Sequence, residues 1–145
     1  MSDSSAKTIL VVDDESHILH VVSLKLRNAG FNVVTANDAE EAFDLAMAGG
    51  GNSGAPAIDL VITDFQMPGK SGLELAKQLH GEPGKAKLPV MLLTAHGLAL
   101  EKVELSRAGI HASLSKPFSP RDLLAQVNEL LEQRDLSVAA AEAGA

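Results

Sequence analysis

The sequence predicts an α/β protein built on a parallel sheet. Apolar runs alternate along the chain with segments of helical periodicity, which is the pattern of strand–helix–strand units. The apolar runs are continuous rather than alternating, as expected for strands that helices cover on both faces. With 145 residues, of which 46% are hydrophobic, the chain has the length and composition of one domain with its own core.

Five segments are predicted strands. The strongest are the aliphatic runs 9–12, 60–63 and 90–93, and the weaker ones are 31–35 and 110–115. Each strand is followed by a predicted helix, and these begin near residues 16, 37 or 38, 71, 98 and 120. The first helix stops at Gly30, and the last begins with Ser119 as N-cap and Pro120 in its first turn.

The domain is expected to span residues 7–133, with residues 1–6 and 134–145 as flexible termini. The glycine-rich segment 49–56 is interpreted as a connector, because it follows a helix and lacks the Gly-Lys-Ser/Thr of a phosphate-binding loop. The alanine-rich residues after Arg134 are interpreted as either a mobile tail or a short helical extension.

Charge and composition argue against several classes of protein. The net charge of −7 and the pI of about 5.1 do not suit binding to a nucleic-acid backbone, which needs a basic face. The absence of cysteine excludes disulfides, thiolate metal sites and thiol nucleophiles. The first residues lack a basic segment followed by an apolar one, so we expect no signal peptide, and no apolar run approaches the ~20 residues of a membrane helix. We therefore expect a cytoplasmic protein with neither a nucleic-acid nor a membrane partner.

Four of the predicted strands end on side chains that suit phosphoryl transfer. In an open parallel sheet, ligands bind in a crevice outside the carboxyl ends of the strands. The sequence therefore predicts that these side chains converge. In chain order they are Asp13, Asp14, Asp64, Thr94 and Lys116.

Three neighbouring carboxylates repel one another unless a cation compensates them. Oxygen ligands alone suit Mg²⁺, which takes one or two carboxylates together with phosphate oxygens. Lys116 supplies a second positive charge and Thr94 a hydroxyl donor for a phosphoryl group. A carboxylate can also act as the nucleophile and form an aspartyl phosphate. Singly, each residue also suits a helix cap, a turn or a strand end; their combination at four strand ends favours one site.

With these motifs, the chain resembles the receiver domain of the two-component response-regulator family, over roughly residues 7–133. The resemblance implies a flavodoxin-like fold, a doubly wound five-stranded parallel sheet in the order 2-1-3-4-5 with five flanking helices. The motifs that carry it are Val11-Val12-Asp13-Asp14-Glu15, Asp64-Phe65-Gln66-Met67-Pro68-Gly69, Leu93-Thr94-Ala95 and Ser115-Lys116-Pro117-Phe118.

The resemblance implies that Asp64 accepts a phosphoryl group from a histidine kinase or a histidine phosphotransfer protein. Asp14 and Asp64 would bind Mg²⁺ directly, together with the backbone carbonyl of Gln66, and Asp13 would act largely through a metal-bound water. Thr94 and Lys116 would bind the phosphoryl oxygens, assisted by the backbone N–H groups of Phe65 and Ala95. Such a domain is a phosphoacceptor that assists its own phosphorylation and dephosphorylation, not an enzyme in the usual sense.

The chain departs from the family at Ser113, where the family usually has an aromatic residue three positions before the lysine. The usual coupling between that ring and the threonine therefore cannot operate, and His111 is either a substitute or an edge residue. Gln66 and His96 lie at positions that tune the lifetime of the aspartyl phosphate in the family, or are solvated loop residues. The remaining histidines are interpreted as residues on the surface or on helix faces; they are His17, His20 and His80.

The leading hypothesis is a single-domain response regulator without a DNA-binding output, whose phosphorylation changes the surface that binds a downstream protein. The alternatives are a phosphorelay intermediate or phosphate sink, and a protein-interaction module that is never phosphorylated. A phosphatase of the haloacid dehalogenase type is disfavoured because Gln66 stands where its second aspartate would be. A flavin-binding domain is disfavoured because the first strand ends in acidic residues.

Overall fold

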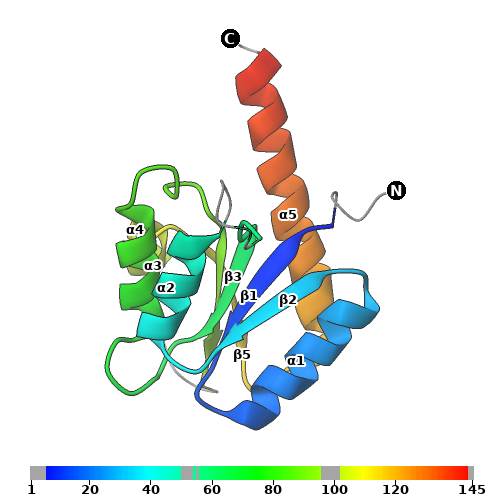
Figure 1. Ribbon diagram of the computed structural model, residues 1–145, viewed down its shortest axis with the longest axis vertical. Coiled ribbons are helices and arrows are strands. Elements are labelled where there is room, and N and C mark those ends of the chain that lie inside the picture. Colours follow the sequence, from blue (N-terminus) through cyan, green and yellow to red (C-terminus); the bar gives the residue numbers. More distant parts are fainter. Residues whose placement is uncertain (1–5, 50–53, 55, 96–101, 144–145) are drawn as a thin grey trace.

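The protein is a five-stranded parallel sheet between two layers of helices (Figure 1). This computed structural model describes residues 6–49, 54, 56–95 and 102–143, with the backbone alone at 102–104, 111 and 135–143. The elements are β1 (Thr8–Val12), α1 (Ser16–Asn28), β2 (Asn32–Ala36), α2 (Ala39–Ala48), β3 (Leu60–Asp64), α3 (Gly72–His80), β4 (Val90–Thr94), α4 (Lys102–Arg107), β5 (Ile110–Ser115) and α5 (Pro120–Ala143).

The strands follow the order β2-β1-β3-β4-β5, and every neighbouring pair is parallel. The predicted fold class and strand order are thereby confirmed. The register pairs Val12 with Thr63, Asp64 with Leu93, and Thr94 with Ser115. The carboxyl ends of β1, β3, β4 and β5 therefore lie along one edge of the sheet, as the site prediction requires.

The hydrophobic core has two halves, one on each face of the sheet. Every residue of β1, β3 and β4 is buried, and successive side chains point to opposite faces. In β1, Leu10 and Val12 pack with α2 and α3, whereas Ile9 and Val11 pack with α1 and α5. Burial on both faces explains why these strands are continuous apolar runs in the sequence.

Local signals start and stop the helices where the sequence predicts. Gly30 follows α1 with a φ of 99°, in the left-handed region that glycine tolerates best. The Asp38 side chain caps α2 by accepting from the backbone N–H of Glu41. Ser71 and Glu74 form a capping box at the start of α3.

The limits of β2, α4 and α5 can be compared with those predicted from the sequence. β2 begins and ends one residue later than predicted, at Asn32 and Ala36. The fourth helix is described from Lys102 onward, and its predicted start at 98 lies outside the described residues. Of the two interpretations of the residues beyond Arg134, the structure agrees with the helical extension: α5 continues to Ala143 and projects past the sheet (Figure 1). The domain limits 7–133 remain a prediction.

His80, one of the histidines interpreted as surface or helix-face residues, is the last residue of α3 and is half-buried, with its ring between two backbone carbonyls. Nδ1 is 2.7 Å from the oxygen of Ala108 and Nε2 is 2.7 Å from that of Leu88. The ring thus links the end of α3 to the segments that precede β4 and β5. His17 and His20 are exposed on α1, as predicted. Among the described residues, no helix is long and apolar enough to cross a membrane.

Candidate functional site

Three aspartates form an acidic cluster at the carboxyl edge of the sheet. Asp13 and Asp14 follow β1 directly, and Asp64 is the last residue of β3, which pairs with β1. One ligand oxygen from each lies within 4.8 Å of the others. Asp13 and Asp64 are buried, whereas Asp14 is exposed. The predicted convergence of the carboxylates is therefore seen in the structure.

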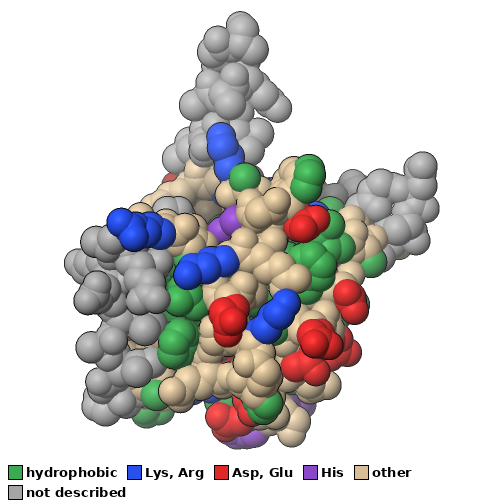
Figure 2. All heavy atoms as spheres, turned by 90° about the vertical axis from the view of Figure 1, so that its left-hand side faces the viewer, with side chains coloured by type: hydrophobic (Ala, Val, Ile, Leu, Met, Phe, Trp, Pro, Cys, Tyr) green, Lys and Arg blue, Asp and Glu red, His purple; other side chains and the backbone are tan. Residues whose placement is uncertain are grey.

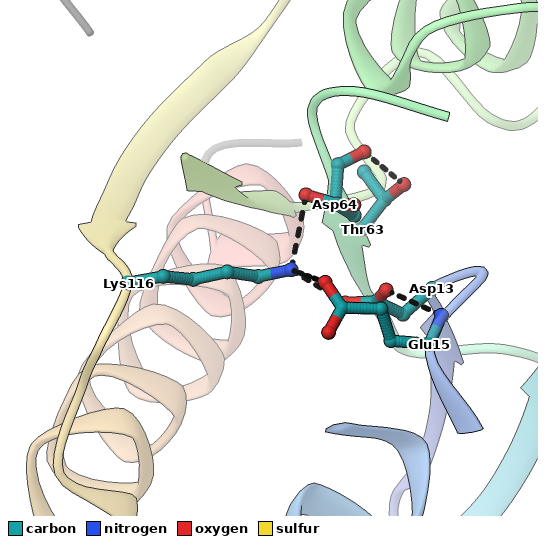
Figure 3. A network of polar contacts seen from close by, with 5 residues as sticks. All are labelled: Asp13, Glu15, Thr63, Asp64 and Lys116. Carbon is teal, nitrogen blue, oxygen red and sulfur yellow. Dashed lines mark hydrogen bonds and ion pairs between the residues drawn. The ribbon is translucent and has the colours of Figure 1, made fainter. Parts of the chain in front are cut away.

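Lys116 follows β5 directly, and its side chain contacts the acidic cluster (Figure 3). Its Nζ lies 3.0 Å from Oδ2 of Asp13 and 3.3 Å from Oδ1 of Asp64. A third carboxylate, that of Glu15, is 3.5 Å away. The backbone fixes this approach, because the N–H of Lys116 donates to the carbonyl of Thr94 over 2.7 Å.

The cluster carries more negative charge than Lys116 can neutralise. Burial raises the pKa of Asp64, and the neighbouring charges of Asp13 and Asp14 raise it further, although Lys116 opposes them. Burial also raises the pKa of Asp13, despite its hydrogen bonds from the Glu15 N–H and from Lys116. For Lys116 itself, burial lowers the pKa, but Asp13 and Asp64 more than offset this and hold it above its usual value.

The donor set fits a small, hard cation. Asp13, Asp14 and Asp64 offer only oxygen ligands, and Lys116 supplies one positive charge against three carboxylates. A divalent cation would compensate the remaining charge, and Mg²⁺ is the ion whose preferred ligands match. The carboxylates named in the sequence analysis are thus placed to hold such an ion. The role assigned to the Gln66 carbonyl remains a prediction.

Thr94 ends β4 beside β5 and is buried at the same edge of the sheet. Ser113 lies on the edge strand β5 and is exposed, so no aromatic ring occupies this position. Gln66 is exposed in the turn after β3. His96 lies outside the described residues, and only the backbone of His111 is described.

Glu15 is the contact that the sequence reasoning missed. Its side chain is exposed, yet its carboxylate lies within 3.5 Å of Lys116 Nζ (Figure 3). A signal was available, because Glu15 follows Asp13 and Asp14 at the end of the same strand as a third consecutive acidic residue. Asp13 also holds the segment in place, since its Oδ1 accepts from the Glu15 N–H over 2.9 Å.

The model of the response regulator receiver domain family matches residues 9–128, which is most of the chain and includes all five strands except the first residue of β1. The chain belongs to this family. Domains of the family are phosphoacceptors of two-component systems, and a phosphorylated aspartate and Mg²⁺ are general features of them.

Curated relatives and solved structures agree with this assignment. The chain is 35% identical over 136 residues to the alkaline phosphatase synthesis transcriptional regulatory protein PhoP of Bacillus subtilis, covering 94% of the chain and 53% of that relative. It is 34% identical to the phosphate regulon transcriptional regulatory protein PhoB of Escherichia coli, covering 88% of the chain and 53% of the relative. The chain thus spans about half the length of these relatives.

Among solved structures, the chemotaxis response regulator CheY4 of Vibrio cholerae matches with a TM-score of 0.77 at 30% identity, covering 87% of this chain and 99% of that one. A response regulator of Chloroflexus aurantiacus matches with the same TM-score at 33% identity, covering 88% and 99%. These two structures have the extent of the receiver domain itself.

Proposed function

We propose that Asp64 is the phosphoacceptor of this receiver domain. The observation that carries the proposal is the placement of Asp64: it is buried at the end of the central strand β3, in contact with Lys116 and within 4.8 Å of ligand oxygens of the two aspartates that follow β1. Asp14 is exposed, and both carboxylate oxygens of Asp13 are engaged, Oδ1 by the Glu15 N–H and Oδ2 by Lys116. Lys116 contacts Asp64 through Oδ1, so Asp64 is the buried carboxylate that is both held by the lysine and left with an oxygen for attack.

In the proposed reaction, a carboxylate oxygen of Asp64 forms a bond to the phosphorus of a phosphohistidine. The bond from phosphorus to the imidazole nitrogen of the donor breaks, and the histidine leaves with that electron pair. Lys116 and the Thr94 hydroxyl bind the phosphoryl oxygens, while Asp13, Asp14 and Asp64 hold Mg²⁺, which supplies charge neutralisation when bound. The contact of Lys116 with Asp64 keeps its ammonium beside the reacting oxygen.

The proposed donor is a histidine kinase or a histidine phosphotransfer protein, and the proposed output is a surface that binds a downstream protein in the cytoplasm. The acidic charge of this chain, −7, supports a protein partner over a nucleic acid for this part of the molecule. The exposed Ser113 implies that the signal reaches that surface without the ring movement usual in the family.

The test is phosphate incorporation from a small phosphodonor, such as acetyl phosphate, in the presence of Mg²⁺. We expect the wild type to take up one phosphoryl group and Asp64→Asn to take up none, because the amide is not a nucleophile. Asp44→Asn, a change of the same kind at an exposed position of α2, serves as the control and should label like the wild type. Undiminished labelling of Asp64→Asn would refute the assignment.

A further inference from the structure

The amino-terminal edge of the sheet, opposite the acidic cluster, carries a hollow of about 600 Å³. Its walls are the segments that precede β3, β4 and β5, together with α5 near the point where the helix leaves the sheet (Figure 1). A volume of this size lies within the range of small-molecule sites, about 300–1,000 Å³.

The floor of the hollow is apolar. Ile58, Leu88 and Leu130 line it with 6%, 6% and 8% of their surfaces exposed, and Pro89 is also buried. Such a floor favours a ligand with an apolar body, because each methylene group removed from water contributes roughly 0.8 kcal/mol.

The charged side chains that line the hollow are mostly basic. Lys85, Lys87 and Arg134 are cations, and Asp59 is the single carboxylate among the lining residues. Asp59 is already engaged, since Oδ1 pairs with Arg134 Nη1 at 2.9 Å and Oδ2 accepts from the Thr8 N–H at 2.8 Å. Neither lysine forms an ion pair with any described side chain, although Lys85 is half-buried.

This local excess of positive charge is opposite in sign to the chain as a whole, which carries −7. Charge is also uneven on the face formed by α2, α3 and α4: basic side chains lie in its upper part and middle, and most acidic ones along its right and lower edges (Figure 2). Two lysines without a carboxylate partner among the described residues, one of them half-buried beside an apolar floor, can contact the charged head of an anionic ligand whose apolar part lies on that floor.

We propose that this hollow binds a small organic anion, with an apolar body on Ile58, Leu88 and Leu130 and a carboxylate, sulfonate or phosphate head near Lys85, Lys87 and Arg134. The site lies at the edge of the sheet opposite the proposed phosphoacceptor, so it does not depend on the function of Asp64. The apolar floor distinguishes this ligand class from inorganic anions, which have no group to place there.

The test uses 8-anilinonaphthalene-1-sulfonate as the probe with the full chain, followed by fluorescence and by amide NMR. We expect saturable one-to-one binding, with shifts at residues 57–59, 84–89, 109 and 130–134. The uncharged analogue N-phenyl-1-naphthylamine should bind about tenfold more weakly, a difference of about 1.4 kcal/mol.

Two variants separate charge from shape. The double variant Lys85→Glu/Lys87→Glu should weaken binding of the sulfonate about tenfold or more and leave the uncharged analogue unaffected. Ala57→Trp, at an exposed lining position, should weaken both probes by filling the hollow. The control Lys70→Glu/Lys77→Glu changes the net charge equally at exposed positions away from the hollow and should bind the sulfonate within a factor of about two of the wild type.

The proposal is overturned if the sulfonate does not saturate, or if the amide shifts map elsewhere. It is also overturned if Lys70→Glu/Lys77→Glu loses as much affinity as Lys85→Glu/Lys87→Glu, because the effect would then be one of net charge. Loss of phosphate labelling in Asp64→Asn, or its persistence, has no bearing on this result, so the two proposals succeed or fail separately.

Discussion

At the scale of single residues, the carboxylates of the acidic cluster lower the stability of the folded protein. Asp13 and Asp64 are both buried, and the pKa of each is raised, first by burial. Their ionised forms therefore destabilise the folded protein at neutral pH even with Lys116 in contact. If the site holds a cation and a phosphoryl group, the ionised carboxylates lower the stability of the protein when neither is bound, because the carboxylates are already in place.

This argument predicts that Asp64→Asn stabilises the metal-free protein. The folded pKa of Asp64 lies above the unfolded value of 3.8, so the folded state binds the proton more tightly, and stability is lost as the pH rises through the folded pKa. Removing the charge should therefore raise the free energy of unfolding at pH 7 by about 1 kcal/mol, or Tm by roughly 2–4 °C.

Thermal melts from pH 7 down to about pH 4 check the prediction, since the gain should shrink as the wild-type carboxyl becomes protonated. Mg²⁺ should raise Tm of the wild type and have a smaller effect on Asp64→Asn, because one ligand is lost. A variant less stable than the wild type at pH 7 would contradict the assignment of Asp64 as a destabilising buried charge.

Some of the residues and contacts of the site could be predicted from the sequence, and others could not. Asp13 and Asp64 were predictable, because each ends a strong apolar run and the carboxyl ends of parallel strands must meet. Lys116 follows the weaker run 110–115, and its position at the end of a fourth strand was predicted from the same rule. Two other features depend on where loops place backbone atoms. They are the contact between Glu15 and Lys116 and the position of the His80 ring between two carbonyls. Hydrophobic periodicity carries no information about such placements, so these features were missed.

At the scale of elements, the position of Asp64 depends on how closely α3 approaches the end of β3. The N–H of Gly72 donates to the carbonyl of Phe65 over 2.9 Å at the first turn of α3. A Cβ at Gly72 would collide with the backbone oxygen of Asp64 and would lie 3.0 Å from side-chain atoms of Thr63 and Leu92. The absence of a side chain at Gly72 therefore lets α3 begin directly beside the proposed phosphoacceptor.

We accordingly predict that Gly72→Ala lowers the free energy of unfolding by about 1–3 kcal/mol, the usual cost of overpacking a core. It should also reduce phosphate labelling, because the end of β3 must shift to relieve the collision. Gly81→Ala, at the other end of α3, is the matched control: its φ is −78° and the nearest atoms lie 3.6 Å away. Chemical denaturation should show the control equal to or more stable than the wild type, and equal losses in both variants would contradict the role of Gly72.

Elements were predicted well where a local signal was strong, as at the Ser71 and Asp38 caps, and less well where tertiary contacts set the limits. Edge strand β2 is displaced by one residue from its prediction, because its half-exposed residues Val33 and Val34 give a weaker apolar pattern than the central strands. The hollow at the amino edge was not predictable at all, since it is formed by loops from three crossovers and the side of α5.

At the scale of the whole molecule, the proposed switch requires that a charge added beside the acidic cluster alters a distant surface without an aromatic ring at position 113. Thr94 and Lys116 end neighbouring strands, and the Lys116 N–H donates to the Thr94 carbonyl. In the proposed switch, a backbone shift at either residue would therefore be passed to the other strand through this hydrogen bond. β5 contacts both α4 and α5, so these elements offer a path that needs no ring.

Amide NMR with Mg²⁺ and beryllofluoride, a mimic of the phosphoryl group, tests this path. We predict shifts that begin at residues 13–14, 64, 94 and 116 and extend through β5 to α4, over residues 102–115, because the two-state rearrangement involves the whole segment. Asp64→Asn should show none of them, while Asp44→Asn should reproduce the wild type. Shifts that stay within the crevice would contradict the switch and favour a phosphorelay intermediate, in which the phosphoryl group is held and passed on while the outer surface stays unchanged.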